Sequence, residues 1–185
     1  MRAAALLGLL GLLILVVACG GTAPRATTPG ESSSSLASPA RDPSRAIEVG
    51  ERMTPIAGPL AIPVKGAKLT MVNYFATWCQ SSQRWMPHVE EMRKKHAAAG
   101  LAVIGVANYD DASQAELEDF VKRSGASFPV SADADHRISR ALPPPGWGQA
   151  IVVVDAKGIV RLVHRGTNEG AFEHVDAEIA RLLAQ

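Results

Sequence analysis

Four continuous apolar runs, separated by stretches with helical periodicity, most constrain what this chain can fold into. The runs cover residues 68–76, 101–107, 149–155 and 159–164. A strand with one face in solvent alternates apolar and polar residues, whereas unbroken runs such as LAVIGVA are typical of strands buried on both faces. The sequence therefore predicts a central sheet that is covered on both sides.

Helical patterns lie between and after the strands. They cover residues 81–99, 113–124 and 169–183. The first is followed by Gly100, a natural helix end. The second opens with Ser113 and Glu116, which have the spacing of a capping box. The turn sequence Asp155-Ala156-Lys157-Gly158 joins the last two strands as a hairpin. This order of elements predicts an α/β domain with a mixed central β-sheet flanked by helices.

The first 18 residues have the layout of a secretory signal peptide, with Arg2 followed by an apolar run that ends at Ala18. The run is shorter than the roughly 20 apolar residues that span a bilayer. It closes with Val16-Val17-Ala18-Cys19-Gly20, which resembles the lipobox of bacterial lipoproteins. That resemblance implies a lipid on Cys19 and an anchored protein in the bacterial cell envelope, facing the periplasm or exterior. The alternative is an ordinary cleaved signal or an uncleaved anchor, with Cys19 incidental.

A segment rich in Ser, Pro and Thr follows the predicted lipid anchor. It contains the run Ser32-Ser33-Ser34-Ser35 and almost no aliphatic residues up to about residue 46. Such a segment cannot bury enough apolar surface to offset the entropy lost on ordering. We therefore expect residues 19–54 to be the lipid anchor and a disordered linker, and residues 55–185 to be the folded domain.

Charge and cysteine content exclude several classes of function. The chain has 19 basic and 18 acidic residues, and its formal net charge is +1. A nearly neutral chain offers no basic face for phosphate backbones, so we expect no nucleic-acid partner. Cys19 and Cys79 are its two cysteines, which excludes a disulfide-stapled scaffold and a cysteine-rich metal site. The histidines are scattered, and we expect no metal and no cofactor. They are His88, His96, His136, His164 and His174.

The stretch that carries chemistry is Tyr74-Phe75-Ala76-Thr77-Trp78-Cys79-Gln80-Ser81-Ser82, which leaves a buried strand and opens a helix. A thiol at a helix start meets unpaired N–H groups and the positive end of the helix dipole, and both stabilise the thiolate. We therefore expect Cys79 to be the catalytic residue; the alternative is a buried, inert cysteine. Trp78 is expected to cover one side of the site, either by core packing, the commoner role of tryptophan, or as a substrate contact. Trp147 either lines a groove near Cys79 or packs in its own loop.

This stretch resembles the FWATWCxxC signature of the thioredoxin superfamily, in particular the TlpA/ResA-like group of membrane-tethered thiol-disulfide oxidoreductases. The resemblance covers roughly residues 55–185. It is carried further by Lys65-Gly66, Met86-Pro87, Val103-Ile104-Gly105-Val106, Phe128-Pro129-Val130, Asp133 and Val152-Val153-Val154-Asp155 with Gly158. It implies a thioredoxin-like fold with the inserted βα unit of that group, and partners that are protein thiols or disulfides in the cell envelope.

Three departures from the group's pattern bear on function. Ser82 stands where the second cysteine is found, and a serine hydroxyl cannot resolve a mixed disulfide. Ser82 either hydrogen-bonds the Cys79 sulfur or caps the helix. Trp85 replaces a frequent glutamate. Gln149 occupies the register of the group's cis-proline, although a loop shift would bring the upstream run 143–145 there.

The chemistry that these departures leave is monothiol. Cys79 would form mixed disulfides with protein or low-molecular-weight thiol partners, and a separate thiol would resolve them. The alternative is a non-catalytic binding module with a degenerate active site. One-cysteine peroxiredoxins also use a single thiolate on this fold, but they need Thr or Ser three residues before the cysteine, where this chain has Ala76.

Overall fold

The computed structural model describes residues 45–108 and 111–185. The predicted signal peptide, Cys19 and most of the predicted linker lie outside the described residues. The predictions for that part of the chain therefore stay predictions.

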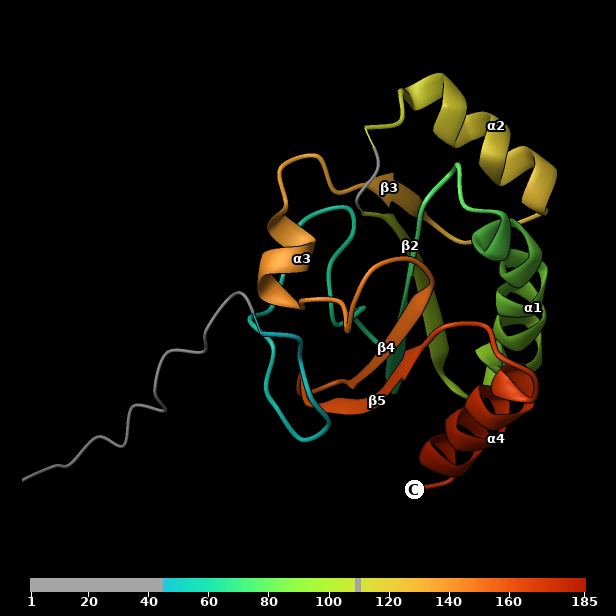
Figure 1. The fold of residues 1–185 in the computed structure, drawn as a ribbon. Coiled ribbons are helices and arrows are strands. Elements are labelled where there is room, and N and C mark those ends of the chain that lie inside the picture. The colour runs from blue at the N-terminus through green and yellow to red at the C-terminus, as the bar shows by residue number, and fades with distance from the viewer. Residues whose placement is uncertain (1–44, 109–110) are drawn as a thin grey trace, which may run out of the picture. The chain divides into compact units, whose positions relative to one another are not determined.

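Within the described residues, five strands form one mixed sheet in the order β3-β2-β1-β4-β5 (Figure 1). Strand β1 lies at the centre, parallel to β2 and antiparallel to β4, and all seven of its residues are buried. Strands β2 and β3 are parallel, and β4 and β5 form an antiparallel hairpin. The mixed sheet and the buried central strand confirm the expectation from the apolar runs. The strands are β1 (Leu69–Phe75), β2 (Leu101–Ala107), β3 (Val130–Ala132), β4 (Ala150–Asp155) and β5 (Val160–Arg165).

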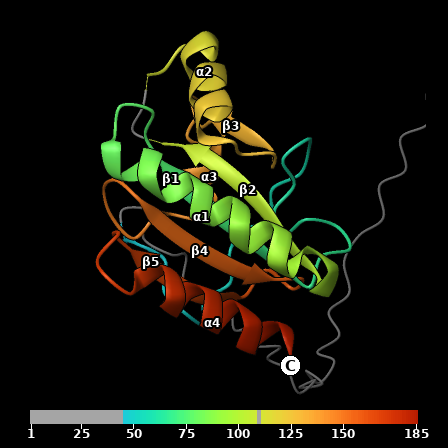
Figure 2. The ribbon, with the colours of Figure 1, turned by 90° about the vertical axis from the view of Figure 1, so that its right-hand side faces the viewer.

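Helices cover both sides of this sheet. Helices α1 and α4 run side by side over one face (Figure 2). Their buried side chains share a core with Phe75 of β1 and with Phe120 of α2, whose ring stacks on Phe75 at 4.9 Å. The opposite face packs against α3 and the segment that precedes β1. The helices are α1 (Gln80–His96), a 3-10 turn (Ala97–Ala99), α2 (Gln114–Ser124), α3 (Arg137–Ala141) and α4 (Ala171–Leu183).

The boundaries of the long elements agree closely with the sequence patterns. Strand β2 has the predicted limits, and Ser113 and Glu116 form both hydrogen bonds of the capping box at the start of α2. Gly100 ends the first helical stretch with a left-handed backbone, φ 109°. The hairpin turn closes with the Gly158 N–H donating to the Asp155 carbonyl.

Two short elements have no sequence pattern of their own. Strand β3 has three half-buried residues and α3 has five residues, so neither is long enough to show a periodicity. Strand β3 follows α2 and pairs with β2, which is the inserted βα unit that the resemblance implied.

The packed body begins earlier than residue 55, where the sequence predicts the end of the linker. Ile47 and Met53 are buried against the sheet, and the Gly50 N–H donates to the carbonyl of Val160 in β5. Arg52 also forms a bridge with Ile159. Isolated apolar residues among polar ones give no periodic signal, so the pattern underestimates the domain by about ten residues.

Candidate active site at the start of helix α1

Cys79 is the N-cap residue of α1, directly after the turn that leaves β1. Its backbone is extended, with φ −83° and ψ 114°. The Cys79 N–H donates to the Ala76 carbonyl at 3.1 Å, and the Cys79 carbonyl accepts from the Gln83 N–H at 3.1 Å. The turn is thus closed on both sides of the thiol. Cys79 is a free, partly exposed cysteine, so a reactant can reach its sulfur.

The surroundings of the sulfur favour the thiolate. Burial acts to raise the pKa of the Cys79 thiol, but the backbone and side-chain groups of Ser82 and Ser81 outweigh it, and the pKa lies below its usual value. The Cys79 side chain forms no hydrogen bond of standard geometry that caps the helix. The first turn of α1 holds no acidic residue that would oppose a negative charge. Cys79 therefore carries more thiolate near neutral pH than an ordinary cysteine.

Ser82 lies one turn into α1 and is completely buried. Its Oγ accepts from the Ala76 N–H at 3.4 Å. Ser82 thus both faces the sulfur and ties the turn to the helix. Its hydroxyl cannot take the part of a resolving thiol, because it forms no S–S bond and does not ionise in this pH range.

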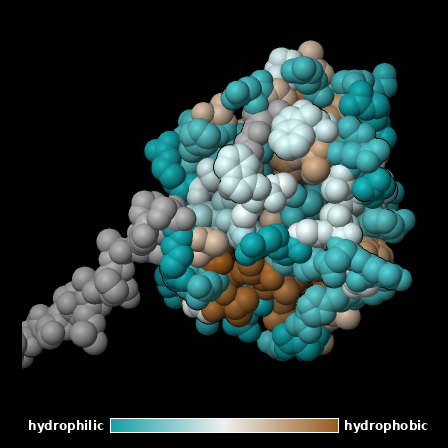
Figure 3. Space-filling view, viewed as in Figure 1, coloured by the Kyte–Doolittle hydropathy of each residue, from teal (hydrophilic) through white to brown (hydrophobic). Residues whose placement is uncertain are grey.

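Trp78 and Trp147 are both exposed, at 68% and 80% respectively. Of the two roles expected for Trp78, core packing is therefore wrong, because its side chain is largely exposed to solvent. On the face drawn in Figure 3, side chains of intermediate hydropathy gather at the end of the sheet where α1 begins, above a separate hydrophobic patch. Trp78, next to Cys79, adds a large exposed ring to this end of the molecule.

Gln149 directly precedes β4 and is buried. Its Nε2 donates to Oδ1 of Asn73 in β1, and Nδ2 of Asn73 lies 3.4 Å from Sδ of Met86 in α1. The Gln149 side chain therefore sits between the sheet and α1. Its Oε1 has no hydrogen-bond partner. The run 143–145 stays upstream of this position, in the loop that follows α3.

Two buried amides at this end of the sheet were not among the site residues that the sequence predicted. Asn73 is a polar residue inside the apolar run of β1. Asn108 follows β2, where its N–H donates to the carbonyl of Phe75, and its side-chain amide is buried with no partner. A polar residue within or directly after an apolar strand was the signal that would have found both.

Trp85, a residue of α1 at the position of the frequent glutamate, is buried where α1 packs against β5 and α4. Its ring is stacked on His164 at 6.1 Å and meets Phe172 edge-on at 6.4 Å. Burial lowers the pKa of His164, which favours the neutral form of this histidine. The position therefore serves packing and holds no carboxylate for proton transfer.

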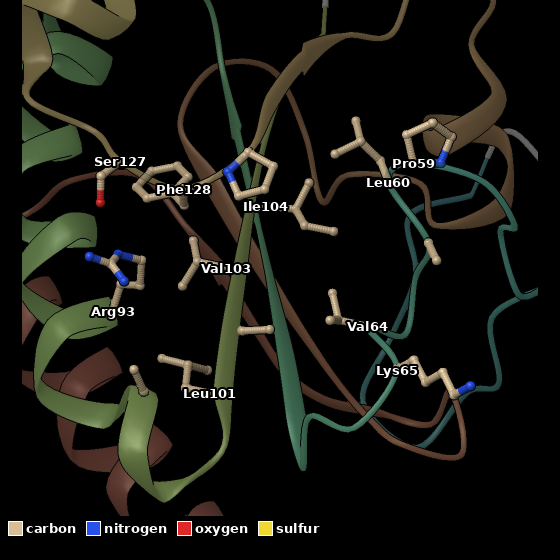
Figure 4. A pocket seen from close by; sticks show the side chains of 14 residues that line it. Pro59, Leu60, Val64, Lys65, Arg93, Leu101, Val103, Ile104, Ser127 and Phe128 are labelled. Carbon is tan, nitrogen blue, oxygen red and sulfur yellow. The ribbon is translucent and has the colours of Figure 1, made fainter.

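An apolar groove lies away from the thiol, across the edge of β2. It has a volume of about 330 Å³. Arg93 and Phe128 line it on one side of β2, and Leu60 and Val64 on the other (Figure 4). It follows the first half of β2, whereas Cys79 follows the far end of β1, with which β2 is parallel. The groove contains no cysteine, so it is not the reactive thiol site.

In residues 45–108 and 111–185, no three side chains of His, Cys, Asp or Glu come together in a way that would hold a metal ion. None of the helices in these ranges has the length and apolar character needed to cross a membrane.

The structure combines a thioredoxin-like sheet with an accessible thiol where the central strand meets the first helix. These two features define a class of protein whose chemistry depends on that thiol. A family model places this chain more narrowly. Residues 61–163 match the AhpC/TSA family, and the chain belongs to that family. The membership agrees with the thioredoxin-like fold that the sequence motif implied.

Curated relatives extend the same likeness. The chain is 30% identical over 110 residues to the thioredoxin-like protein YneN of Bacillus subtilis (strain 168), which covers 56% of this chain and 59% of YneN. It is 29% identical over 73 residues to the thiol-disulfide oxidoreductase ResA of Bacillus anthracis, which covers 38% of this chain and 40% of ResA. The chain thus spans about two fifths to three fifths of the length of these relatives.

Solved structures show the same fold. A protein described as a thiol:disulfide interchange protein DsbE from Chlorobium tepidum superposes with a TM-score of 0.65 at 22% identity, covering 75% of this chain and 99% of that protein. A secreted disulfide oxidoreductase of Mycobacterium tuberculosis superposes with a TM-score of 0.51 at 20% identity, covering 62% of this chain and 81% of that one.

Proposed function

We propose that this protein is a monothiol member of the thiol-disulfide oxidoreductases, with Cys79 as its nucleophile. The observation that carries the proposal is the placement of Cys79. It is a partly exposed thiol at a helix start, its pKa is lowered by Ser82 and Ser81, and Ser82 is buried where a dithiol enzyme has its second cysteine.

The reaction proceeds in two exchanges. The Cys79 thiolate attacks one sulfur of a disulfide, so that an S–S bond forms to Cys79, the substrate S–S bond breaks, and the other half leaves as a thiolate. A second, external thiolate then attacks the sulfur held by Cys79 and returns Cys79 to its thiolate. Electrons balance within the two exchanges, so no further oxidant or reductant is required.

We also propose that the protein works in the bacterial cell envelope, held to the membrane by lipid on Cys19. The lipobox-like run before Cys19 supports this, as does the likeness to a secreted oxidoreductase. Labelled palmitate should be incorporated into the native chain and not into the Cys19→Ala variant. Equal labelling of the two chains would contradict lipid anchoring through this residue.

Trapping of partners tests the exchange reaction. Mixed disulfides with envelope proteins should be recovered with the native chain and disappear with Cys79→Ala. The Ser82→Cys variant is a gain-of-function control, because it restores two thiols one helical turn apart and should acquire dithiol reductase activity. An unreactive Cys79 thiol at neutral pH would remove the proposal.

The exposed Trp78 favours one other function, a binding module that holds partners at this face without covalent chemistry. If Cys79→Ala recovers the same partners and Trp78→Ala loses them, the binding module is the correct assignment. Peroxide reduction is not favoured, because Ala76 provides no hydroxyl three residues before the thiol.

A further inference from the structure

A small groove opens beside the first half of α1. One wall is a stripe of α1 side chains at helical spacing, namely Ser81, Arg84, Trp85 and His88. The stripe begins two residues after Cys79, and Ser81 also contributes to the lowered pKa of the thiol. The groove therefore extends along the helix from the reactive sulfur.

The second wall comes from the connection between β5 and α4. Thr167 and Asn168 line it before the helix, and Phe172 lines it from the first turn of α4. Figures 1 and 2 both show this connection beside the first half of α1. The Phe172 ring lies 4.6 Å from that of His88, which joins the two walls. The volume is about 280 Å³. That is near the lower limit of small-molecule sites, so the groove suits a small ligand rather than a folded protein.

The chemistry of the walls favours an anion. Arg84 is exposed and forms no ion pair within the described residues. His88 is the second basic side chain, and it lies 3.4 Å from the carboxylate of Glu91. Ser81, Thr167 and Asn168 add hydrogen-bond donors. The indole N–H of Trp85, which also lines the groove, is buried with no hydrogen-bond acceptor.

We infer that this groove binds the non-reacting part of a small, carboxylate-bearing disulfide, and that Arg84 positions one of its carboxylates while Cys79 attacks its sulfur. This inference rests on the proposed monothiol function and names a substrate class for it. The bound half remains on Cys79 as a mixed disulfide, and the other half leaves as a thiolate. A thiolate of a different molecule, such as an envelope protein, then attacks the bound half and leaves with it as a mixed disulfide, so that Cys79 returns to its thiolate and sulfur and electrons balance.

The test compares two disulfide probes on the full chain carrying Cys19→Ser, so that Cys79 is its one remaining thiol. The probes are oxidised glutathione, which carries carboxylates, and hydroxyethyl disulfide, which is neutral. Mixed-disulfide formation is followed by intact mass. The ratio of the two rates is the readout, because any change in the thiolate fraction of Cys79 cancels in it.

We expect Arg84→Gln to lower the preference for oxidised glutathione about five- to tenfold, as for loss of a charge-assisted hydrogen bond. Arg123→Gln, an exposed arginine of α2, is the matched control and should leave the ratio unchanged. Asn168→Ala should lower the ratio about twofold without any change in charge. The preference should also persist at about 0.5 M salt, which screens long-range attraction.

Two results would overturn the inference and are distinguishable. If both probes react with Cys79 but Arg84→Gln and Arg123→Gln give the same ratio, the groove is not the subsite, while the monothiol function stands. If neither probe forms a mixed disulfide with Cys79, the proposed function fails together with the subsite.

Discussion

Helices α1 and α2 begin in opposite ways. At the start of α2, Ser113 accepts from the Glu116 N–H, and the Glu116 carboxylate accepts from the Ser113 N–H. At the start of α1, Cys79 occupies the same position and makes no such cap, and the first turn has no acidic residue. One helix start uses its N–H groups for stability, and the other leaves them available to a sulfur anion.

Helix α1 tolerates an open start because tertiary contacts hold it elsewhere. Trp85, Met86, Val89 and Met92 are buried against the sheet. Glu90 is also buried and binds Arg93 through two hydrogen bonds, while Ser127 donates to it from both its N–H and its hydroxyl. Helix α2 buries only Leu117 and Phe120 along its length, so its caps matter more. Because packing and the hydrogen-bonded Glu90 carboxylate stabilise α1 further along, its first N–H groups can stay available to the Cys79 sulfur.

The largest expected effect comes from removing the anchor of α1. The hydrogen bonds from Arg93, assisted by Ser127, lower the pKa of Glu90 to about 2, against the opposing effect of burial. Since this value lies below the unfolded one, the stabilisation is complete above about pH 4.5 and is lost as pH falls toward 2. Glu90→Gln should lower the free energy of unfolding by about 2 kcal/mol at pH 7 and reduce its fall toward low pH, measured by urea unfolding. An unchanged fall toward low pH would show that another group causes it.

The next effect concerns the open helix start itself. Ser82→Ala removes a hydroxyl that lowers the pKa of Cys79 and leaves the Ala76 N–H without its partner. Alkylation of Cys79 at pH 7 should slow about three- to tenfold. Ser124→Ala, at the far end of α2, is the control and should leave the rate unchanged. A faster reaction in Ser82→Ala would contradict the role given to this hydroxyl.

The capped start should respond in stability alone. Ser113→Ala removes the acceptor of the capping box and should cost about 1 kcal/mol in urea unfolding. Cys79 alkylation should not change, because the site belongs to another helix. The hydrogen bonds from Ser113 also lower the pKa of Glu116, so this contribution is present above the unfolded pKa and is lost as pH falls through the folded one.

The smallest effect comes from giving α1 the charge that α2 has. Gln80→Glu places a carboxylate in the first turn, where the dipole stabilises it by about 0.5 kcal/mol. The same carboxylate disfavours a nearby thiolate, so alkylation of Cys79 should slow about two- to threefold. Gln114→Glu is the equivalent first-turn change in α2, where the existing Gln114 amide donates to Glu118. It brings two carboxylates together, and their repulsion offsets the gain from the helix dipole, so stability should stay nearly unchanged. Alkylation of Cys79 should also stay nearly unchanged, because Cys79 belongs to another helix. Equal slowing in both variants would show a non-local cause.

Much of the fold and part of the site follow from the sequence. The buried strands, the capping box and the Gly100 helix end are local features, so periodicity and cap residues predict them. Cys79 and Ser82 were also predictable, because their place after a buried strand sets their place on the helix. The outward position of Trp78 was not, because the turn geometry, rather than hydropathy, decides which way that ring points.

The sequence by itself determined the buried strands, the thiol at a helix start and the missing second cysteine, because each depends on residues close together in the chain. Only the tertiary structure decided that Ile47 and Met53 belong to the core, that Gln149 pairs with Asn73, and that Arg84 and Phe172 line one groove. Those partners lie tens of residues apart. Their contacts depend on how strands and helices pack, which no local pattern records.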